Sequence, residues 1–451
     1  MIPIQGVWNI LAKVKLKYRE NKRNIWYNQE KKINLQTNGT SCFFFVGSAK
    51  CLMFRNLYTM RQSLCVQNFG PIKNVDVNFG DLTILIGPQA SGKSLFLELF
   101  KLIKDKAHIV STLKKYNYIL NKSDINPLLD YYFGESMSQI LSDSTEILFE
   151  GEKFNMTSLL QGKNNSEEAV FYVPAQRILS ISDGRPKNFM EFDITTPYVL
   201  RVFSETLRVF IQGGLGNPDT IFPMRNRLKV NMRDSINNTI FHGGKVVIDQ
   251  TAGQRKMKLN VGKAKLPFMT WSAGQKEFMP LLLAMYCLSG PPTSVINKDG
   301  YKWVVIEEPE MGLHPKAIET VVLQIIELMQ NGYKVIVSTH STILLEFAWA
   351  FGILKNLADH TFRKAMCELF SVDTHDSMAN LFKDLKKKNV KTYFMSSNGG
   401  EGVVSSDISS LDVESDTDFV ADWGGLSFFA GKASEIVGKF CRSSSCQYKQ
   451  C

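Results

Sequence analysis

The residues with the clearest chemical meaning form a glycine-rich stretch at positions 87 to 94, GPQASGKS. It matches the pattern GxxxxGK[ST], in which the amides of a tight loop and the positive end of the following helix bind phosphate oxygens. The ammonium group of Lys93 would lie at the β- and γ-phosphates, and the hydroxyl of Ser94 would bind Mg²⁺. The predicted nucleoside triphosphate loop consists of Gly87, Pro88, Gln89, Ala90, Ser91, Gly92, Lys93 and Ser94.

Two adjacent carboxylates follow an apolar run later in the chain. Residues 303 to 306 read Trp-Val-Val-Ile, and Glu307 and Glu308 come directly after them. On a strand that ends beside the phosphate loop, the first carboxylate would hold the metal and its water shell. The second would orient and polarise the attacking water. We therefore expect Glu307 to serve Mg²⁺ and Glu308 to serve hydrolysis; the alternative is that both acids only favour the helix start at Pro315.

A second helix start with small residues occurs at SAGQK, positions 272 to 276. The phosphate loop already has its own helix start, so this second anion site makes best sense facing a nucleotide on another copy of the chain. We therefore expect a head-to-tail homodimer in which Ser272, Gly274 and Gln275 contact the partner's nucleotide. The motif is weak by itself, because serine is a common N-cap residue.

A histidine follows another apolar strand, predicted for residues 334 to 337. His340 lies just past the carboxyl end of that strand, where it would face the γ-phosphate and sense it. The alternative is a packing or surface histidine.

The elements that carry these residues predict an α/β fold. Residues 82 to 86 and 170 to 173 are further apolar runs, typical of strands buried on both faces. A helix predicted for residues 315 to 329 lies between two strands, and such a βαβ order implies a parallel sheet. Alternating residues from 64 to 79 predict an antiparallel β part before it. Residues 178 to 265 are predicted to hold a helical piece followed by a hairpin around Gly253.

The charge of the chain is concentrated at its beginning. The protein has 451 residues and a net charge of +10, and the first 59 residues hold ten Lys or Arg against two Glu, a net of +8. The rest is nearly neutral, which disfavours a body built to bind nucleic acid. We expect residues 1–59 to be a basic N-terminal extension, either disordered or spurious. The alternative is a basic arm that contacts nucleic acid.

The sequence contains neither a stretch long and apolar enough to span a membrane nor a recognisable export signal. Its longest apolar runs are shorter than the roughly 20 residues that a spanning helix needs, and no export signal begins it. The eight cysteines contain no CxxC pair. We therefore expect a cytoplasmic protein with reduced thiols and no membrane contact.

Taken together, GPQASGKS, SAGQK, VVIEEPEMGLHP and STHS resemble the ABC-type P-loop ATPases of the SMC, RecF and OLD group, often described in bacteria as AAA family ATPases. The resemblance covers residues 60 to 350. It implies an ABC-ATPase head with a mostly parallel central sheet, an antiparallel N-terminal β part and a helical signature lobe. It also implies ATP and Mg²⁺ as cofactors, ATP hydrolysis, a role for Gln176 at Mg²⁺ or the attacking water, and a D-loop at residues 310 to 314.

Two departures from the family pattern narrow the function. Transporter ATPases usually carry Asp-Glu where this chain has Glu307 and Glu308. OLD nucleases carry a Toprim domain after the switch histidine, but only 111 residues follow His340, so we expect no such domain. The expected domains are the extension, an ATPase domain at 60–350 with insertions at about 105–165 and 178–265, and a helical and acidic-loop region at 351–451.

The resemblance predicts an ATP-driven switch that dimerises around ATP and controls a separate effector protein, in a DNA-related or anti-phage defence process. The alternative is a RecF-like repair ATPase that binds DNA directly, through a patch such as Lys386, Lys387, Lys388 and Lys391. An ABC transporter subunit is the least favoured interpretation.

Overall fold

The structure of the protein, a computed structural model, describes residues 33–37, 40–44, 62–160, 167–215, 219–250, 253–397, 402–412, 423–426 and 432. The chain divides into two compact units, Met1–Arg61 and Gln62–Cys451. In the first unit, strands β1 (Ile33–Thr37) and β2 (Thr40–Phe44) form an antiparallel pair. The rest of the predicted extension lies outside the described residues.

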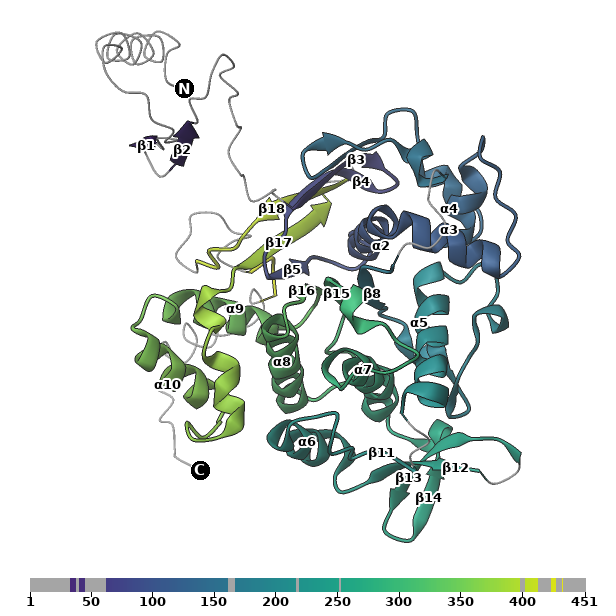
Figure 1. Ribbon diagram of the computed structural model, residues 1–451, viewed down its shortest axis with the longest axis vertical. Coiled ribbons are helices and arrows are strands. Elements are labelled where there is room, and N and C mark those ends of the chain that lie inside the picture. Colours follow the sequence, from purple (N-terminus) through teal and green to yellow (C-terminus); the bar gives the residue numbers. More distant parts are fainter. Residues whose placement is uncertain are drawn as a thin grey trace, which may run out of the picture. The chain divides into compact units, whose positions relative to one another are not determined.

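The second unit is built on a ten-stranded mixed sheet with the order β7-β6-β3-β4-β18-β17-β5-β16-β15-β8 (Figure 1). The strands are β3 (Ser63–Phe69), β4 (Ile72–Asn78), β5 (Leu82–Ile86), β6 (Glu146–Phe149), β7 (Glu152–Lys153), β8 (Val170–Val173), β15 (Trp303–Glu307), β16 (Lys334–Ser338), β17 (Val390–Ser397) and β18 (Val403–Asp407). Strands β17, β5, β16, β15 and β8 are parallel, and β3, β4, β6 and β7 are antiparallel. The predicted mostly parallel sheet with an antiparallel N-terminal part is confirmed.

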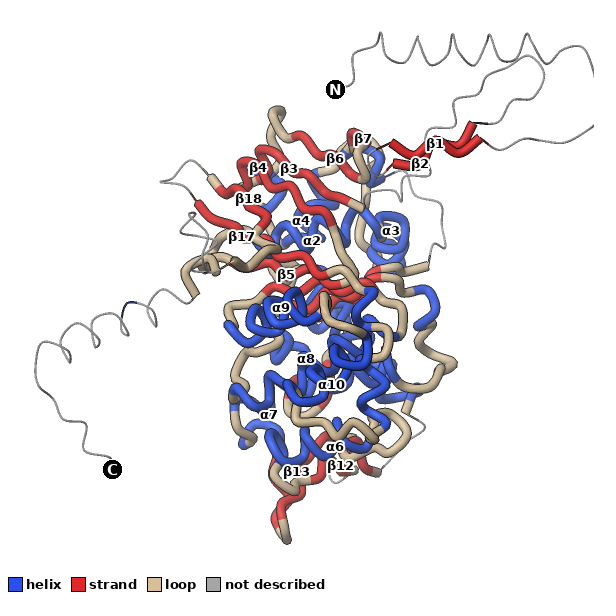
Figure 2. The backbone as a smooth tube through the Cα atoms, turned by 90° about the vertical axis from the view of Figure 1, so that its left-hand side faces the viewer, coloured by secondary structure: helices blue, strands red, loops and turns tan. Residues whose placement is uncertain are grey.

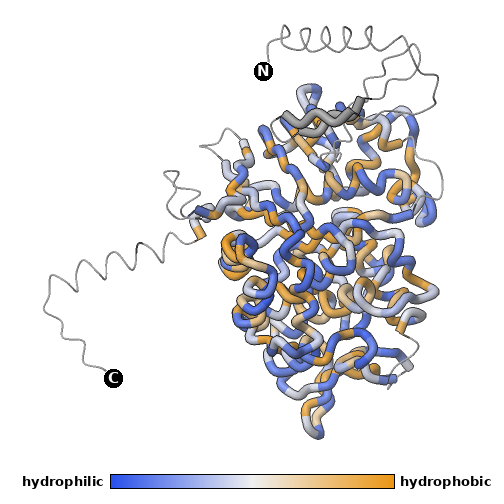
Figure 3. The backbone as a smooth tube through the Cα atoms, turned by 60° about the vertical axis from the view of Figure 1, so that its left-hand side comes forward, coloured by the Kyte–Doolittle hydropathy of each residue, from blue (hydrophilic) through white to orange (hydrophobic). Residues whose placement is uncertain are grey.

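Helices cover both faces of the parallel strands (Figure 2). They are α2 (Lys93–Lys104), α3 (Lys106–Lys115), α4 (Asn126–Phe133), α5 (Tyr198–Val209), α6 (Val230–Ile236), α7 (Ala273–Ser289), α8 (Pro315–Gln330), α9 (Thr342–Leu354) and α10 (Asp359–Leu369). Successive strand residues face opposite sides, so Leu85 packs in the core with α2, α3 and α4, while Ile84 and Ile86 pack in the core with α7, α8 and α9. The apolar stretches of the chain run through these layers (Figure 3).

A small four-stranded antiparallel sheet follows α5 in the chain, with the order β11-β12-β13-β14. Its strands are β11 (Thr220–Phe222), β12 (Lys245–Asp249), β13 (Lys256–Val261) and β14 (Ala264–Pro267). Strands β12 and β13 pair directly on either side of Gly253, so the predicted hairpin is confirmed. A shorter pair, β9 (Ile181–Ser182) and β10 (Arg185–Pro186), precedes α5.

The C-terminal region contributes strands to the central sheet. Its sequence predicts helices and an acidic loop, but after α9 and α10 the chain enters the sheet as β17 and β18, between β4 and β5. Strands β17 and β18 form a local antiparallel pair, but they join the sheet through β5 and β4, which lie more than 300 residues earlier in the chain. Their place in the sheet therefore leaves no local pattern to read. Most of the acidic stretch after residue 412 lies outside the described residues. In the described part of the chain, no helix is both long and apolar enough to cross a membrane.

Candidate nucleotide site

Four neighbouring parallel strands bring the predicted site residues to one edge of the sheet. In the order β5-β16-β15-β8, Ser338 at the end of β16 lies beside both Leu85 and Glu307. Parallel strands end at the same edge, so the loop after β5, the turn after β16 and the acidic end of β15 are neighbours. This side is the carboxyl edge, and the side on which these strands begin is the amino edge.

The path of the phosphate loop depends on glycine at two positions. Gly87 has a φ of 154°, and a Cβ there would lie 2.1 Å from the carbonyl oxygen of Met395 in β17. Gly92 has a φ of 71° and is the N-cap of α2, so no side chain caps that helix start. Other residues rarely adopt such angles. The uncapped amides of α2 are therefore directed at the loop, which suits a phosphate.

Lys93 is buried inside this loop, with 6% of its surface exposed. Its Nζ donates hydrogen bonds to the carbonyl oxygens of Gly87 at 2.9 Å and Pro88 at 2.8 Å, and to the hydroxyl of Ser91 at 3.1 Å. Burial lowers the pKa of its ammonium group, and the carboxylates of Glu308, Glu307 and Glu310 oppose that shift. The partners of Lys93 are thus neutral groups, which a charged phosphate would displace.

Glu307 is buried at the last position of β15, with 3% of its surface exposed. Its Oε2 accepts a hydrogen bond from the amide of Ala175 at 3.1 Å, and the hydroxyls of Ser94 and Tyr172 lie near the same carboxylate. Burial raises the pKa of this carboxyl group, and the hydrogen bonds oppose the rise. Its Oε1 has no ordinary hydrogen-bond partner among the described residues. A buried carboxylate oxygen that lacks a donor, beside a hydroxyl, fits a hard cation such as Mg²⁺.

Glu308 has a left-handed backbone conformation, with a φ of 41°. Its amide donates to the carbonyl oxygen of Ser338 at 2.8 Å, and its Oε1 lies 3.6 Å from Nε2 of His340. Non-glycine residues with such angles are uncommon and occur preferentially at functional sites. The two residues predicted to act on water and on the γ-phosphate therefore lie side by side, on the ends of adjacent strands.

Glu310 fixes the turn that carries His340, a role that sequence reasoning missed. Its Oε1 accepts hydrogen bonds from the Thr339 hydroxyl at 2.8 Å and from the His340 amide at 2.6 Å. The third acid of the Glu-Glu-Pro-Glu run was the available signal, but only the fold brings it to the neighbouring strand.

Arg177 is the second missed residue, and it is completely buried. Its guanidinium group donates to the carbonyl oxygens of Glu307, Glu308 and Glu277. Burial lowers the pKa of the guanidinium group, and the carboxylates of four nearby glutamates oppose this effect. The neighbouring Gln176, predicted to contact Mg²⁺ or water, has an exposed side chain and follows Ala175, whose amide binds Glu307. The segment therefore reaches the carboxyl edge.

The SAGQK segment forms a capped helix start with an exposed tip. The Ser272 hydroxyl accepts a hydrogen bond from the Gln275 amide, and the Gln275 side chain accepts one from the Ser272 amide, which is a capping box. The Gln275 side chain also donates to the Ile240 carbonyl oxygen at 3.0 Å, so it is already engaged within its own chain. A Cβ at Gly274 would lie 2.5 Å from the Gly312 carbonyl oxygen. Ser272 itself is exposed.

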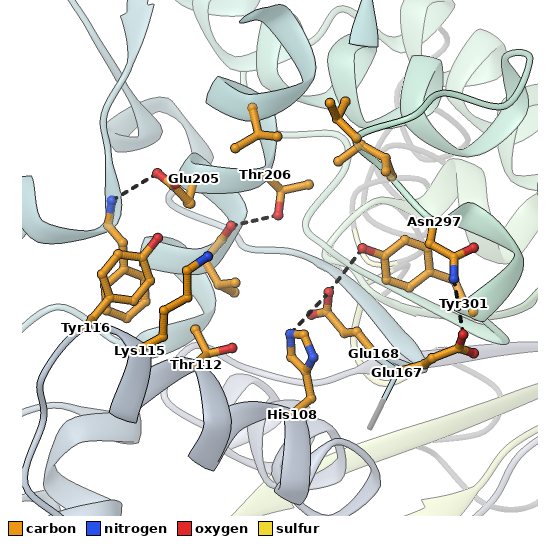
Figure 4. Close-up of a pocket in the computed structure, with 16 residues that line it drawn as sticks. His108, Thr112, Lys115, Tyr116, Glu167, Glu168, Glu205, Thr206, Asn297 and Tyr301 are labelled. Atoms are coloured by element: carbon orange, nitrogen blue, oxygen red, sulfur yellow. Dashed lines mark hydrogen bonds and ion pairs between the residues drawn. The ribbon is translucent and has the colours of Figure 1, made fainter. Parts of the chain in front are cut away.

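A second charged cluster lies at the amino edge, around Lys101 of α2. Its Nζ binds Asp105 at 2.9 Å and Glu168 at 2.6 Å, and all three side chains are largely or fully buried. Glu168 uses its other oxygen to accept a hydrogen bond from the Tyr301 hydroxyl at 3.0 Å, and His108 lies 4.0 Å from it. Of these residues, His108, Glu168 and Tyr301 line a cavity of about 410 Å³ between α3 and α5 (Figure 4).

Comparisons with known proteins agree with this geometry. Residues 60–193 match a family described as an AAA ATPase domain. Residues 230–346 match a family described as an AAA domain, putative AbiEii toxin, Type IV TA system. The first match contains the phosphate loop, and the second contains the SAGQK segment, the acidic strand end and His340.

A stretch of 72 residues is 33% identical to the Old nuclease of Escherichia phage P2; it covers 16% of this chain and 12% of the length of that nuclease. Among solved structures, an SMC head bound to the C-winged helix domain of ScpA is 13% identical, with a TM-score of 0.36 over 77% of this chain and 97% of that one. The SMC head domain from Thermotoga maritima is 12% identical, with a TM-score of 0.34 over 77% of this chain and 98% of that one. A dimeric bacterial ABC transporter cassette is 13% identical, with a TM-score of 0.28 over 63% of this chain and 90% of that one.

The two domain matches agree with what the residues indicate: a phosphate loop after β5, an acidic end of β15 and a histidine after β16, all on one edge of a parallel sheet. The chain is therefore an ATPase with two segments that match AAA domain families, and its ordered motifs resemble those of the SMC, RecF and OLD group.

Proposed function

We propose that the protein is a cytoplasmic ATP-driven switch that dimerises around ATP and controls a separate effector protein. The observation that carries the proposal is the carboxyl edge, where Lys93, Glu307, Glu308 and His340 converge from three adjacent strands. A nucleotide there would meet a loop, a metal ligand and a group able to polarise water, which are the parts that phosphoryl transfer to water needs.

In this proposal Lys93 leaves its loop carbonyls and binds the β- and γ-phosphates. Ser94 and Glu307 would hold Mg²⁺, which would neutralise charge on the phosphates when bound. Glu308 accepts a hydrogen bond from the attacking water and orients it towards the γ-phosphorus. The neighbouring His340 contacts the γ-phosphate, and this contact is lost when the phosphate leaves. Glu310 holds the turn that carries His340 in place for this contact.

The exposed start of α7 supports the dimer. Ser272 and Gly274 lie at a helix N-terminus, where partial positive charge favours an anion. In a head-to-tail arrangement, this start closes over the γ-phosphate on the other copy. The engaged side chain of Gln275 limits it to shaping the helix start, whereas the exposed Ser272 remains available to the partner's nucleotide.

The matched families support a role beside another protein. One is described with a toxin of a type IV toxin–antitoxin system, and the short relative is a phage nuclease. Both matched segments of this chain are ATPase domains, and an ATPase would act on such a process by controlling an effector. We therefore place the switch in DNA-related or anti-phage defence processes.

The test is the Glu308→Gln protein, purified with and without ATP and Mg²⁺, with its mass measured by light scattering. We expect a monomer without nucleotide and a long-lived dimer with ATP, because the variant binds ATP but hydrolyses it at least about 100-fold more slowly. Proteins that co-purify only with the dimer would be the effector candidates. A monomer under both conditions, or a dimer that ignores ATP, would contradict the proposal.

The alternative of direct DNA binding loses support at the lysine patch. Each of its four lysines lies within 4.0 Å of a carboxylate: Lys386 with Asp359, Lys387 with Asp384, Lys388 with Asp81, and Lys391 with Asp407. A patch neutralised in this way offers little net charge to phosphates, so retention on DNA that falls steeply with salt would be needed to revive this alternative.

A further inference from the structure

We propose that Arg177 mechanically couples the start of α7 to the acidic end of β15, so that the helix start's contact with a second copy's nucleotide sets the position of Glu308. The inference rests on the proposed function, because it assumes the head-to-tail dimer. It assigns a positioning role to a residue that lies outside the four motifs.

The contacts of Arg177 join three segments through one rigid group. Its Nε donates to the Glu277 carbonyl oxygen in α7 at 3.1 Å, one terminal nitrogen donates to the Glu307 carbonyl oxygen at 3.0 Å, and the other donates to the Glu308 carbonyl oxygen at 3.1 Å. Arg177 itself begins the 3-10 turn η3 (Arg177–Ser180) after β8. A planar guanidinium group fixes the directions of all three bonds together.

Burial makes this connection stiff. None of the Arg177 surface is exposed, so a lost hydrogen bond there cannot be replaced by bulk water. Oε2 of Glu277 lies 3.8 Å from Nε and has no hydrogen-bond partner among the described residues. The charge of the guanidinium group is therefore balanced by carboxylates on both sides of the connection, and movement of either side disturbs the other.

A second contact links the same two segments. The start of α7 touches the turn after β15, since Gly274 and Gly312 approach so closely that a Cβ on Gly274 would lie 2.5 Å from a carbonyl oxygen. The helix start is thus held to the acidic strand end at two places, by backbone packing at Gly274 and by hydrogen bonds through Arg177. A shift of the helix tip must reach the backbone of Glu308.

The consequence in a dimer is communication between the two nucleotides. The helix start of one copy faces the nucleotide of the other, while Glu308 of that copy acts on its own nucleotide. Arg177 lies between them, so each site would hydrolyse ATP only when the other is closed. A displacement of about 1 Å at a reacting group can reduce the rate by about two orders of magnitude. A small movement of the α7 start is therefore sufficient to switch hydrolysis at Glu308 on or off.

The test compares Arg177→Lys with wild type and with Glu308→Gln. Lysine keeps the positive charge but cannot hold three carbonyl oxygens in one plane. We expect kcat to fall at least about 10-fold with KM for ATP within about twofold, because binding is intact and the water is mispositioned. We also expect Arg177→Lys to form a long-lived dimer with ATP and Mg²⁺, as Glu308→Gln does.

Arg201→Lys is the matched control. Arg201 is equally buried, in α5, but its guanidinium group binds the Tyr118 hydroxyl and the Tyr131 carbonyl oxygen, away from the carboxyl edge. We expect it to lower thermal stability while kcat and KM stay within about twofold of wild type. This control separates the loss of a buried arginine from the loss of coupling.

Each outcome decides between the two proposals. Wild-type kcat in Arg177→Lys, or a monomer with ATP where Glu308→Gln dimerises, would overturn the coupling and leave the switch intact. Failure of Glu308→Gln to dimerise would overturn the switch itself. If Arg177→Lys does not fold, Glu277→Gln decides: a fall in kcat of about two- to fivefold at constant KM supports the coupling, and an unchanged kcat overturns it.

Discussion

Helix α2 carries two buried lysines, one at each edge of the sheet, and they are bound in opposite ways. Lys93 at the carboxyl edge donates to two carbonyl oxygens and a hydroxyl, whereas Lys101 at the amino edge donates to Asp105, Glu168 and a carbonyl oxygen. Lys93 forms no ion pair with any described residue, and Lys101 forms two. A buried charge that forms no ion pair with a described residue is the stronger indication of a ligand site.

The carboxylates of Glu307 and Glu168 show the same contrast between the two edges. Burial raises the pKa of Glu307, and its hydrogen bonds only oppose the rise. Burial would also raise the pKa of Glu168, but the Lys101 ammonium, with His108 and the Tyr301 hydroxyl, outweighs it and lowers the pKa. For Lys101, burial favours a lower pKa and the two carboxylates reverse the direction. At the amino edge Lys101 is therefore paired with two carboxylates, whereas Lys93 and Glu307 at the carboxyl edge form no ion pair with a described residue.

The largest expected effect is the loss of stability on Lys101→Met. The substitution leaves Asp105 and Glu168 buried without their cation, which costs roughly 3–5 kcal/mol of unfolding free energy. Urea unfolding would measure it. The comparison between the two edges predicts that the folded fraction keeps a kcat within about threefold of wild type. A larger loss of kcat would show that the amino edge takes part in turnover.

In contrast to Lys101→Met, Lys93→Met should reduce turnover strongly and change the unfolding free energy little. Turnover should fall about 10²- to 10³-fold, equivalent to about 2.7–4 kcal/mol, because a donor to the transferred phosphate is lost. The unfolding free energy should change by less than about 1 kcal/mol, since burial already opposes the charge of Lys93. Steady-state ATPase assays and urea unfolding of the same preparation would check both. A destabilised Lys93→Met protein with normal turnover would reverse the assignment of the two edges.

Glu307 and Glu168 should change the stability of the protein with pH dependences of opposite sign. The folded-state pKa of Glu307 is raised, so its ionised form costs stability above the ordinary pKa of about 4.3, and Glu307→Gln should stabilise the nucleotide-free protein at pH 7. The folded-state pKa of Glu168 is lowered, so its ionised form contributes stability above about pH 4.3 that is lost as the pH falls further, and Glu168→Gln should destabilise at pH 7.

Thermal unfolding between pH 4 and pH 8 would test this pair. The Tm difference between each variant and wild type should shrink as the pH falls towards the ordinary glutamate range, from above zero for Glu307→Gln and from below zero for Glu168→Gln. Differences of equal sign at pH 7 would mean that the two carboxylates are in similar electrostatic surroundings.

The strands that end at the carboxyl edge were easier to predict from the sequence than the contacts that join them. Residues 82 to 86, 170 to 173, 303 to 306 and 334 to 337 were predictable as strands because their apolar runs are local, and the structure confirms them. Strands β17 and β18 were not, since β17 is only partly buried and the strands β5 and β4, through which this pair joins the sheet, are distant in the chain. The family motifs give residue types, but Arg177 and Glu310 act through contacts across strands that no spacing encodes.

The smallest expected effect is at the cavity of the amino edge, with Tyr301→Phe. The change removes only the hydroxyl that donates to Glu168 at 3.0 Å, so the unfolding free energy should fall by about 1 kcal/mol. The ion pair of Glu168 with Lys101 remains, and therefore kcat and KM should stay within about twofold of wild type. Urea unfolding and ATPase assays would measure both quantities. A tenfold change in kcat from this one hydroxyl would mean that the cavity communicates with the carboxyl edge along α2, which begins at Lys93 and also carries Lys101.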